Sequence, residues 1–192
     1  MSKRTINQRI AELFLTDSRD FLRRYKVLLE ISLNGNVGMR YKLLTELLFA
    51  TECSIKAMIF LESTDNESTT YGKIFEHDLN KLLNKLSSKE KDKCSKYIDQ
   101  ILIGCKIDIR YLAEGNKKFR NSNDYEQKYY DTIVDHSWHK SVYENLNKLE
   151  QYVNSKIPNK DFELINFNNE NIEAMFKEEE KITNLERTKK TQ

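Results

Sequence analysis

Apolar residues recur at steps of three and four along almost the whole chain, which is the spacing of amphipathic α-helices. The first such stretch covers residues 5–33, and Thr5 with Gln8 forms a capping box at its start. Its expected buried stripe is Ile6, Ile10, Leu13, Phe14, Phe21, Tyr25, Leu28 and Ser32. Residues 16–18 can divide it into a short and a longer helix, because short polar side chains compete for backbone groups. Asn and Gly at residues 34–38 end it.

Residues 39–61 are apolar on nearly every side, which is typical of a helix at the centre of a bundle. Glu52 and Lys56 interrupt this pattern, four residues apart, and the pair has two interpretations. On a helix surface it is an ion pair worth about 0.2–0.5 kcal/mol. Inside the bundle it holds the register of the helices.

Residues 62–72 are polar and predict a loop. Asp78 then caps a short helix, and its first residue, Leu79, is expected to enter the core. We expect the preceding His77 to pack or hydrogen-bond beside a long helix. This interpretation makes the whole His77, Asp78 and Leu79 segment structural.

Ser87 with Glu90 forms a second capping box, which opens a helix with Cys94 and Cys105 on one buried face. Cys53 brings the number of thiols to three, and no two of them have the Cys-x-x-Cys spacing. An odd number without that spacing supports neither a disulfide framework nor a zinc ribbon. We therefore expect reduced thiols in the core.

The remaining chain predicts an extended connector at residues 107–111 and a long final helix at about residues 123–155. The stripe expected on that helix is Tyr125, Tyr129, Ile133, His136, Tyr143, Leu146, Leu149 and Val153. Pro158 blocks its continuation. We therefore expect an all-α, up-and-down helical bundle at residues 1–158 and a short C-terminal helical appendage with a frayed tail at 159–192.

Composition agrees with a helical fold, since five Gly and one Pro among 192 residues are too few for a turn-rich β-fold. The 32 basic and 30 acidic residues balance and give no general signal for binding polyanions. No window approaches the roughly 18 uninterrupted apolar residues of a membrane span, and the N-terminus lacks the apolar core of a signal peptide. We expect a soluble, cytoplasmic protein.

Candidate chemistry is sparse. The chain has no Gly-rich phosphate loop, no His-Glu-x-x-His motif and no nucleophile elbow. His136 and His139 lie three apart and could bind a metal with a third ligand from elsewhere. The favoured alternative has no metal, a partly buried His136 and an exposed His139. Tyr and Trp side chains of the final helix could stack on bases, although core packing or a dimer interface is the favoured interpretation.

Several short motifs in order resemble the HEPN superfamily over roughly residues 20–155. They are Leu44-x-x-x-Leu48-Phe49-Ala50-x-Glu52-x-x-x-Lys56-Ala57, His77-Asp78-Leu79-x-x-Leu82-Leu83 and Ile109-Arg110-Tyr111 before a Tyr-rich helix. The resemblance implies a helical bundle that commonly dimerises through its long helices. HEPN proteins are metal-independent ribonucleases of toxin–antitoxin, abortive-infection and CRISPR systems, or non-catalytic modules that bind nucleotides or RNA.

The chain departs from the catalytic HEPN pattern, in which an Arg is followed by a His after four to six residues. No His of this chain has an Arg at that distance. The nearest fragment has Arg120 and Asn121, with Tyr125 in place of His, and Tyr is a poor base at neutral pH because its reference pKa is near 10.

The resemblance therefore implies a non-catalytic binding or assembly module of a bacterial phage-defence or toxin–antitoxin system. Its partner would be a protein, an RNA or a nucleotide, bound through Arg110, Tyr111 and Arg120, with no cofactor and no metal. Arg110 has an alternative role in an ion pair to a carboxylate such as Glu52. Two other functions stay open: a metal-independent ribonuclease using Arg120, Asn121 and Tyr125, and a helical adaptor without a ligand.

A homodimer is also expected. The central helix and the final helix carry more apolar and aromatic surface than one side of a small bundle needs, and an isologous interface would cover that surface.

Overall fold

The structure, a computed structural model, describes residues 5–33, 39–105 and 130–158. The chain divides into two units, residues 1–158 and 159–192, and all described residues belong to the first. Their helices are α1 (Ile6–Leu33), α2 (Met39–Glu62), α3 (Glu67–Lys73), α4 (Leu79–Leu83), α5 (Ser88–Ser95), α6 (Gln100–Ile103) and α9 (His136–Asn154). A π-helical turn, η2 (Tyr130–Val134), precedes α9, and these residues include no strand. The fold is all-α, as predicted.

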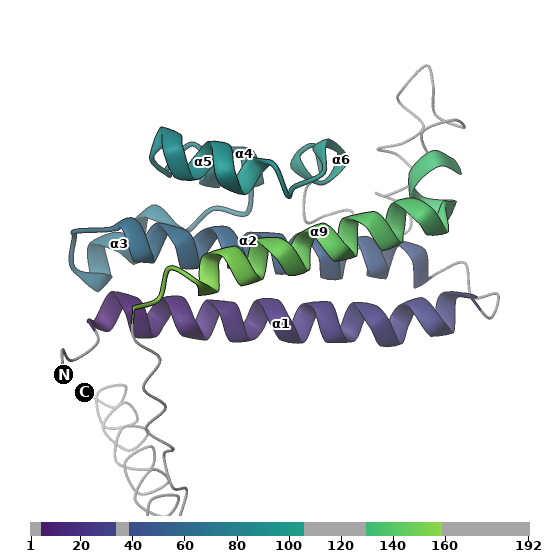
Figure 1. Cartoon of the computed structure of the whole chain (residues 1–192), viewed down its shortest axis with the longest axis horizontal. Coiled ribbons are helices and arrows are strands. Elements are labelled where there is room, and N and C mark those ends of the chain that lie inside the picture. Colours follow the sequence, from purple (N-terminus) through teal and green to yellow (C-terminus); the bar gives the residue numbers. More distant parts are fainter. Residues whose placement is uncertain (1–4, 34–38, 106–129, 159–192) are drawn as a thin grey trace, which may run out of the picture. The chain divides into compact units, whose positions relative to one another are not determined.

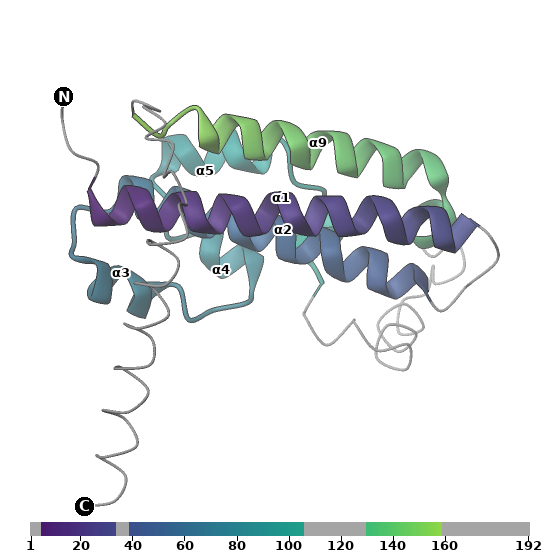
Figure 2. The same cartoon turned by 90° about the horizontal axis from the view of Figure 1, so that it is seen from below.

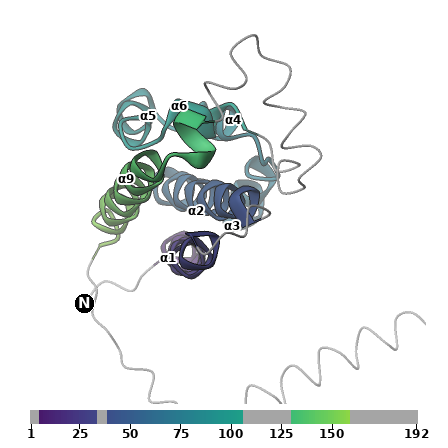
Figure 3. The same ribbon diagram turned by 90° about the vertical axis from the view of Figure 1, so that its right-hand side faces the viewer.

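The helix α2 lies at the centre of the bundle. It runs antiparallel to α1, and α9 lies beside both of them (Figures 1 and 2). The short helices α4, α5 and α6 lie on the side of α2 away from α1, as the end-on view in Figure 3 shows. Two of them, α4 and α6, contact α2 directly. This position explains why α2 is apolar on nearly every side.

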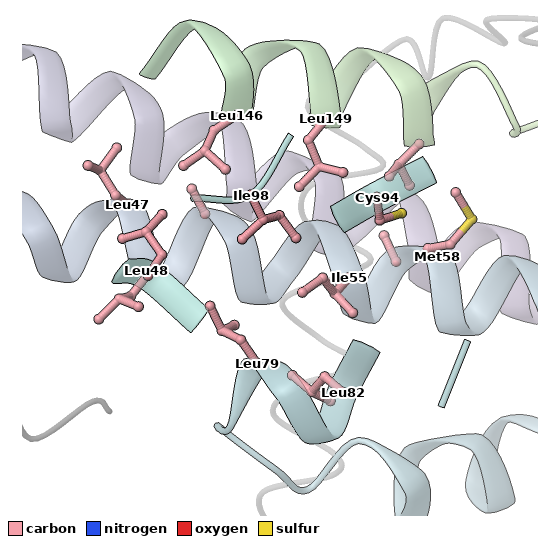
Figure 4. Close-up of a cluster of buried hydrophobic side chains, with 14 of the residues drawn as sticks. Leu47, Leu48, Ile55, Met58, Leu79, Leu82, Cys94, Ile98, Leu146 and Leu149 are labelled. Carbon is pink, nitrogen blue, oxygen red and sulfur yellow. The ribbon is translucent and has the colours of Figure 1, made fainter. Parts of the chain in front are cut away.

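The core is built around α2 and takes side chains from each neighbouring helix. Leu47, Leu48, Ile55 and Met58 of α2 meet side chains of the short helices on one side and of α9 on another (Figure 4). These partners are Leu79, Leu82, Cys94, Ile98, Leu146 and Leu149. Burying each of the aliphatic side chains contributes roughly 1.5–3 kcal/mol relative to leaving it exposed.

Small side chains line the contact between α1 and α2. Ala11 and Ser18 of α1 are fully buried, and Ala50 and Ser54 of α2 are buried to about one per cent exposure. The Ser18 hydroxyl donates to the Ala50 carbonyl oxygen at 2.9 Å and lies 2.9 Å from the Ser54 hydroxyl. The expected interruption at residues 16–18 is therefore wrong. Ser18 satisfies its hydroxyl on α2 instead of competing for the backbone of its own helix.

A second correction concerns residues 62–72, which were expected to be a loop, because residues 67–72 belong to the helix α3. Asn66 is its N-cap, because its side chain accepts a hydrogen bond from the Thr69 backbone N–H at 2.9 Å. Thr70 faces inward, and its hydroxyl lies 2.7 Å from that of Ser63. A polar sequence therefore forms a helix here, because its cap and its one buried hydroxyl are both satisfied.

The segment after Ser87 is two short helices, α5 and α6, in place of one long helix. Ser87 caps α5 as predicted, and Asp99 starts α6 by accepting from the Ile101 backbone N–H at 2.8 Å. The Glu90 carboxylate accepts a hydrogen bond from the Tyr152 hydroxyl and lies 3.5 Å from the Lys156 ammonium. Glu90 thereby joins α5 to the C-terminal end of α9.

The final helix also begins later than predicted. Asp135 caps it, because its carboxylate accepts from the backbone N–H groups of Ser137 and Trp138 at 3.0 and 3.1 Å. The expected start at Asn123 and the expected connector at 107–111 lie outside the described residues. Across the part of the chain that the structure describes, no helix has the length and apolar character needed to cross a membrane.

We predict that Ser18→Val is more destabilising than Ser18→Ala. The alanine variant loses only the hydrogen bonds to α2, which costs about 1 kcal/mol. The valine variant also adds methyl groups where α1 and α2 meet through small side chains, and overpacking costs about 1–3 kcal/mol more. Chemical denaturation of both variants measures the free energy of unfolding. Thr16→Val, at an exposed position of the same helix, is the control and should change it by less than about 0.5 kcal/mol.

Candidate functional site

A buried ion pair lies at the middle of α2. The Lys56 ammonium is 2.6 Å from a Glu52 carboxylate oxygen, and the two side chains are only 10% and 9% exposed. Their four-residue spacing puts them on one face of the helix. The pair is therefore buried and is not on the helix surface, while its role in the register of the helices stays a prediction. Each charge there depends on the other, because an unpaired charge in a core is strongly unfavourable.

His77 adds a third group to this pair. Its Nδ1 lies 3.0 and 3.2 Å from the two carboxylate oxygens of Glu52. Its ring is 61% exposed, so it covers Glu52 from the solvent side. The Glu52 carboxylate therefore ties the connection between α3 and α4 to the centre of α2. We call Glu52, Lys56 and His77 the α2 triad.

The residues that follow His77 anchor the start of α4. The Asp78 carboxylate accepts hydrogen bonds from the backbone N–H groups of Asn80 and Lys81, at 3.0 and 3.1 Å. Leu79, the first residue of α4, is buried in the core. Together these contacts fix the connection from which His77 reaches Glu52.

The two histidines of α9 are placed the opposite way to the expectation. His139 is buried and His136 is exposed. The Nδ1 atom of His139 lies 3.0 Å from the Tyr25 hydroxyl of α1, and the two rings stack. Desolvation by burial raises the pKa of Tyr25 above its ordinary value, and the nearby Tyr143 adds to this effect. His139 therefore helps to attach α9 to α1.

The three cysteines are all buried and free, as predicted. Burial raises the pKa of the Cys53 thiol to about 12, and the neighbouring Glu52 carboxylate contributes to this shift. The pKa of Cys94 is also raised to about 12, mainly by burial. At neutral pH these thiols are protonated, and the thiolate is the reactive form.

Five of the sequence candidates, Arg110, Tyr111, Arg120, Asn121 and Tyr125, lie outside the described residues. Among the residues that the structure describes, no three His, Cys, Asp or Glu side chains are grouped so that they could hold a metal ion. No family model, no curated protein and no solved structure matches this chain.

An apolar stripe on the outside of α1 was not foreseen from the sequence. It consists of Ile6, Leu13, Val27 and Ile31, which are all exposed although two of them were expected in the core. Their separations of seven, fourteen and four residues are each close to a whole number of helical turns, so they share one side of α1. We call this side the outer face. The sequence signal for the outer face was the seven-residue spacing from Ile6 to Leu13, which places both residues on one side of a helix.

The outer face of α1 changes the expectation about where a partner binds. The central helix was expected to offer a dimer interface, yet its apolar residues are buried within one protomer. That part of the expectation is wrong, because α1, α9 and the short helices already cover α2. The apolar surface that remains exposed is concentrated on α1.

We predict that Glu52→Gln lowers the free energy of unfolding by about 3–5 kcal/mol, because it leaves the buried Lys56 ammonium without its counter-charge. Replacing Glu52 and Lys56 together by methionine should recover most of this loss. Glu46→Gln is the matched control on the same helix, since the pair of Glu46 with Arg24 is more exposed and worth at most about 1 kcal/mol. Equal losses in Glu52→Gln and Glu46→Gln would contradict the role of the buried pair.

We also predict that Asp78→Ala and Leu79→Ala lower stability by different amounts. The first removes a helix cap and should cost about 1 kcal/mol. The second leaves a cavity and should cost about 2–5 kcal/mol. Thermal and urea unfolding measure both. A structural role would be wrong for Asp78 if its replacement abolished binding of a partner while the unfolding midpoint stayed unchanged.

Proposed function

We propose that this protein is a non-catalytic binding and assembly module that binds a protein partner through the outer face of α1. The HEPN resemblance adds a setting to this proposal, a bacterial phage-defence or toxin–antitoxin system. The observation that carries the proposal is the stripe of Ile6, Leu13, Val27 and Ile31. These four are among six large apolar side chains exposed on the described part of the chain.

The charges of α1 favour a protein over a nucleic acid as the partner. Five basic and four acidic residues are interspersed along this helix, so the acidic side chains interrupt its positive charge. A phosphate backbone is bound mainly by clustered Lys and Arg side chains. An apolar stripe between charges of both signs is instead typical of a helix that packs against another helix.

The α2 triad supports a structural role in place of catalysis. A carboxylate that orients a histidine also occurs in general-base sites, where the imidazole acts on a nucleophile. In the described part of the chain, no Ser, Thr or Cys side chain hydrogen-bonds to His77. The Glu52 charge is already neutralised by Lys56 at 2.6 Å, which fits a role in holding the connection between α3 and α4 against α2.

We predict that the purified chain leaves RNA intact, both with Mg²⁺ and with a chelator. The measurement is gel analysis of end-labelled RNA over a range of protein concentrations. Metal-independent cleavage by the wild type that is lost in Arg120→Ala and in Tyr125→Phe would overturn the non-catalytic proposal. It would establish the degenerate motif as an active site.

The same proposal makes a positive prediction about α1. A photo-cross-linking residue at the exposed Thr16 should give one discrete adduct in the cells that naturally produce the chain. The double variant Leu13→Glu, Val27→Glu should lower the yield of this adduct at least about tenfold, because it places charges in the apolar contact. A cross-linker at Phe75, which is 88% exposed but lies outside α1, is the control. Absence of any adduct from position 16 would refute a binding role for the outer face.

A further inference from the structure

We propose that the protein has a second interaction surface, where lysines of α5 lie beside lysines of α9, and that it binds an Asp- and Glu-rich segment of another protein. This surface is separate from the outer face of α1, since α5 lies on the side of α2 away from α1 (Figure 3). We call it the lysine face. It consists of Lys89, Lys93 and Lys96 in and directly after α5, and of Lys148 and Lys156 in and directly after α9.

The centre of the lysine face is a buried carboxylate with two ammonium groups beside it. The Glu90 Oε1 atom lies 3.7 Å from the Lys93 ammonium and 3.5 Å from the Lys156 ammonium. The same two ammonium groups lie over the Tyr152 ring, 5.7 and 5.1 Å from its centroid. The Glu90 side chain is 9% exposed, whereas those of Lys93 and Lys156 are 38% and 35% exposed. An approaching anion therefore meets ammonium groups before it meets the carboxylate.

Three further lysines extend this positive charge into solvent. Lys89, Lys96 and Lys148 are all exposed, and in the described part of the chain none of them pairs with an acidic residue. Lys89 and Lys96 lie along the same side of α5 as Lys93, because they are four and three residues away from it. Lys148 lies four residues before Tyr152, whose hydroxyl reaches α5, so it shares the side of α9 that faces α5.

The contacts of Tyr152 favour carboxylates over a nucleic acid as the ligand. Single-stranded nucleic acids gain affinity when their bases stack on open aromatic rings. The Tyr152 ring is already occupied by the two ammonium groups, and the Tyr97 ring lies 6.2 Å from it. The helices α5 and α9 also contain no arginine, the residue whose planar fork binds phosphate through two hydrogen bonds.

The lysine face also lacks the apolar side chains that insert into a membrane surface. The large apolar residues exposed on the described part of the chain lie on α1, on α3 and at Phe75. None of them is on α5 or α9. Charge alone is therefore left to recognise the partner.

The spacing of the lysines fits an extended acidic segment. Lys89 and Lys93 are separated by about 6 Å along the axis of α5, since each helical residue rises about 1.5 Å. Side chains on one side of an extended peptide repeat about every 6.7 Å. Alternate Asp or Glu residues of such a segment can therefore pair with successive lysines of this face.

The first test is the fluorescence anisotropy of a labelled oligoglutamate peptide titrated with the purified chain. We expect saturable binding that weakens at least about fivefold between about 0.01 M and about 0.15 M salt, because salt screens exposed charges. An oligoglutamine peptide of the same length should not bind. Absence of oligoglutamate binding at the lowest salt concentration would refute the inference.

Substitution of the exposed lysines tests the position of the contact. The triple variant Lys89→Gln, Lys96→Gln, Lys148→Gln should weaken oligoglutamate binding at least about tenfold at about 0.1 M salt, because it removes the charges that attract the peptide. These side chains are exposed, so the variant should fold, and circular dichroism checks this.

A matched control removes three exposed lysines elsewhere, with the same change in net charge. The variant Lys26→Gln, Lys42→Gln, Lys140→Gln should weaken binding by less than about twofold, because at this salt concentration charges beyond about 10 Å are largely screened. Equal weakening in the two triple variants would show that overall charge binds the peptide, and it would refute a role for the lysine face.

A change of the opposite sign is expected at Asp92. This exposed acidic residue lies one helical turn from Lys89 and from Lys96. Asp92→Asn should therefore strengthen oligoglutamate binding at least about twofold, because it removes a repulsive charge beside the contact. Binding that is unchanged or weaker in this variant would contradict the proposed position of the peptide.

Two further probes decide the class of partner. Single-stranded oligouridylate and vesicles that contain phosphatidylserine should each bind at least about tenfold more weakly than oligoglutamate, because the face offers neither an open ring nor an apolar anchor. Oligouridylate that binds as tightly as oligoglutamate, and loses affinity in the Lys89, Lys96 and Lys148 variant, would overturn the inference in favour of a nucleic acid. Equally tight binding of the vesicles would overturn it in favour of a membrane surface.

Discussion

Burial of α2 on nearly every side is the constraint on which the rest of the structure depends. A helix with so little solvent-facing surface must be enclosed by other elements, and α1, α9, α4 and α6 all meet it. The same burial makes Glu52 and Lys56 dependent on each other, because neither charge is solvated. His77 reaches the same carboxylate from the connection between α3 and α4. The centre of α2 therefore determines both the packing of the bundle and the position of the α2 triad.

Patterns that depend on neighbours in sequence were readable without the structure. The extent of α2 followed from its continuous apolar character, and the caps at Thr5, Asp78 and Ser87 followed from side chains that satisfy backbone N–H groups within three residues. The free state of the cysteines followed from their number and spacing. Each of these features is decided locally or by composition, so a single sequence contains the required information.

Features that depend on distant contacts were not readable. The helix α9 begins at the Asp135 cap, so its buried face cannot be found by counting helical turns from Asn123. That count placed His136 on the buried face, whereas His139 is the buried histidine. On α1, two apolar faces exist and only tertiary packing decides which of them meets α2, so Ile6 and Leu13 were assigned to the wrong one. The α2 triad joins residues 25 apart, and that contact is fixed by the path of the chain after α3.

The closeness of α1 and α2 in sequence has a consequence for the order in which the protein is made. Residues 34–38 are the whole connection between these helices, so their extensive contact closes only a short loop. The helix α9 adds its contacts from much later in the chain. During synthesis the α1–α2 hairpin can therefore assemble while α9 is still to be translated. Until α9 arrives, the side of α2 that it covers is exposed, and exposed apolar surface makes a nascent chain prone to aggregation.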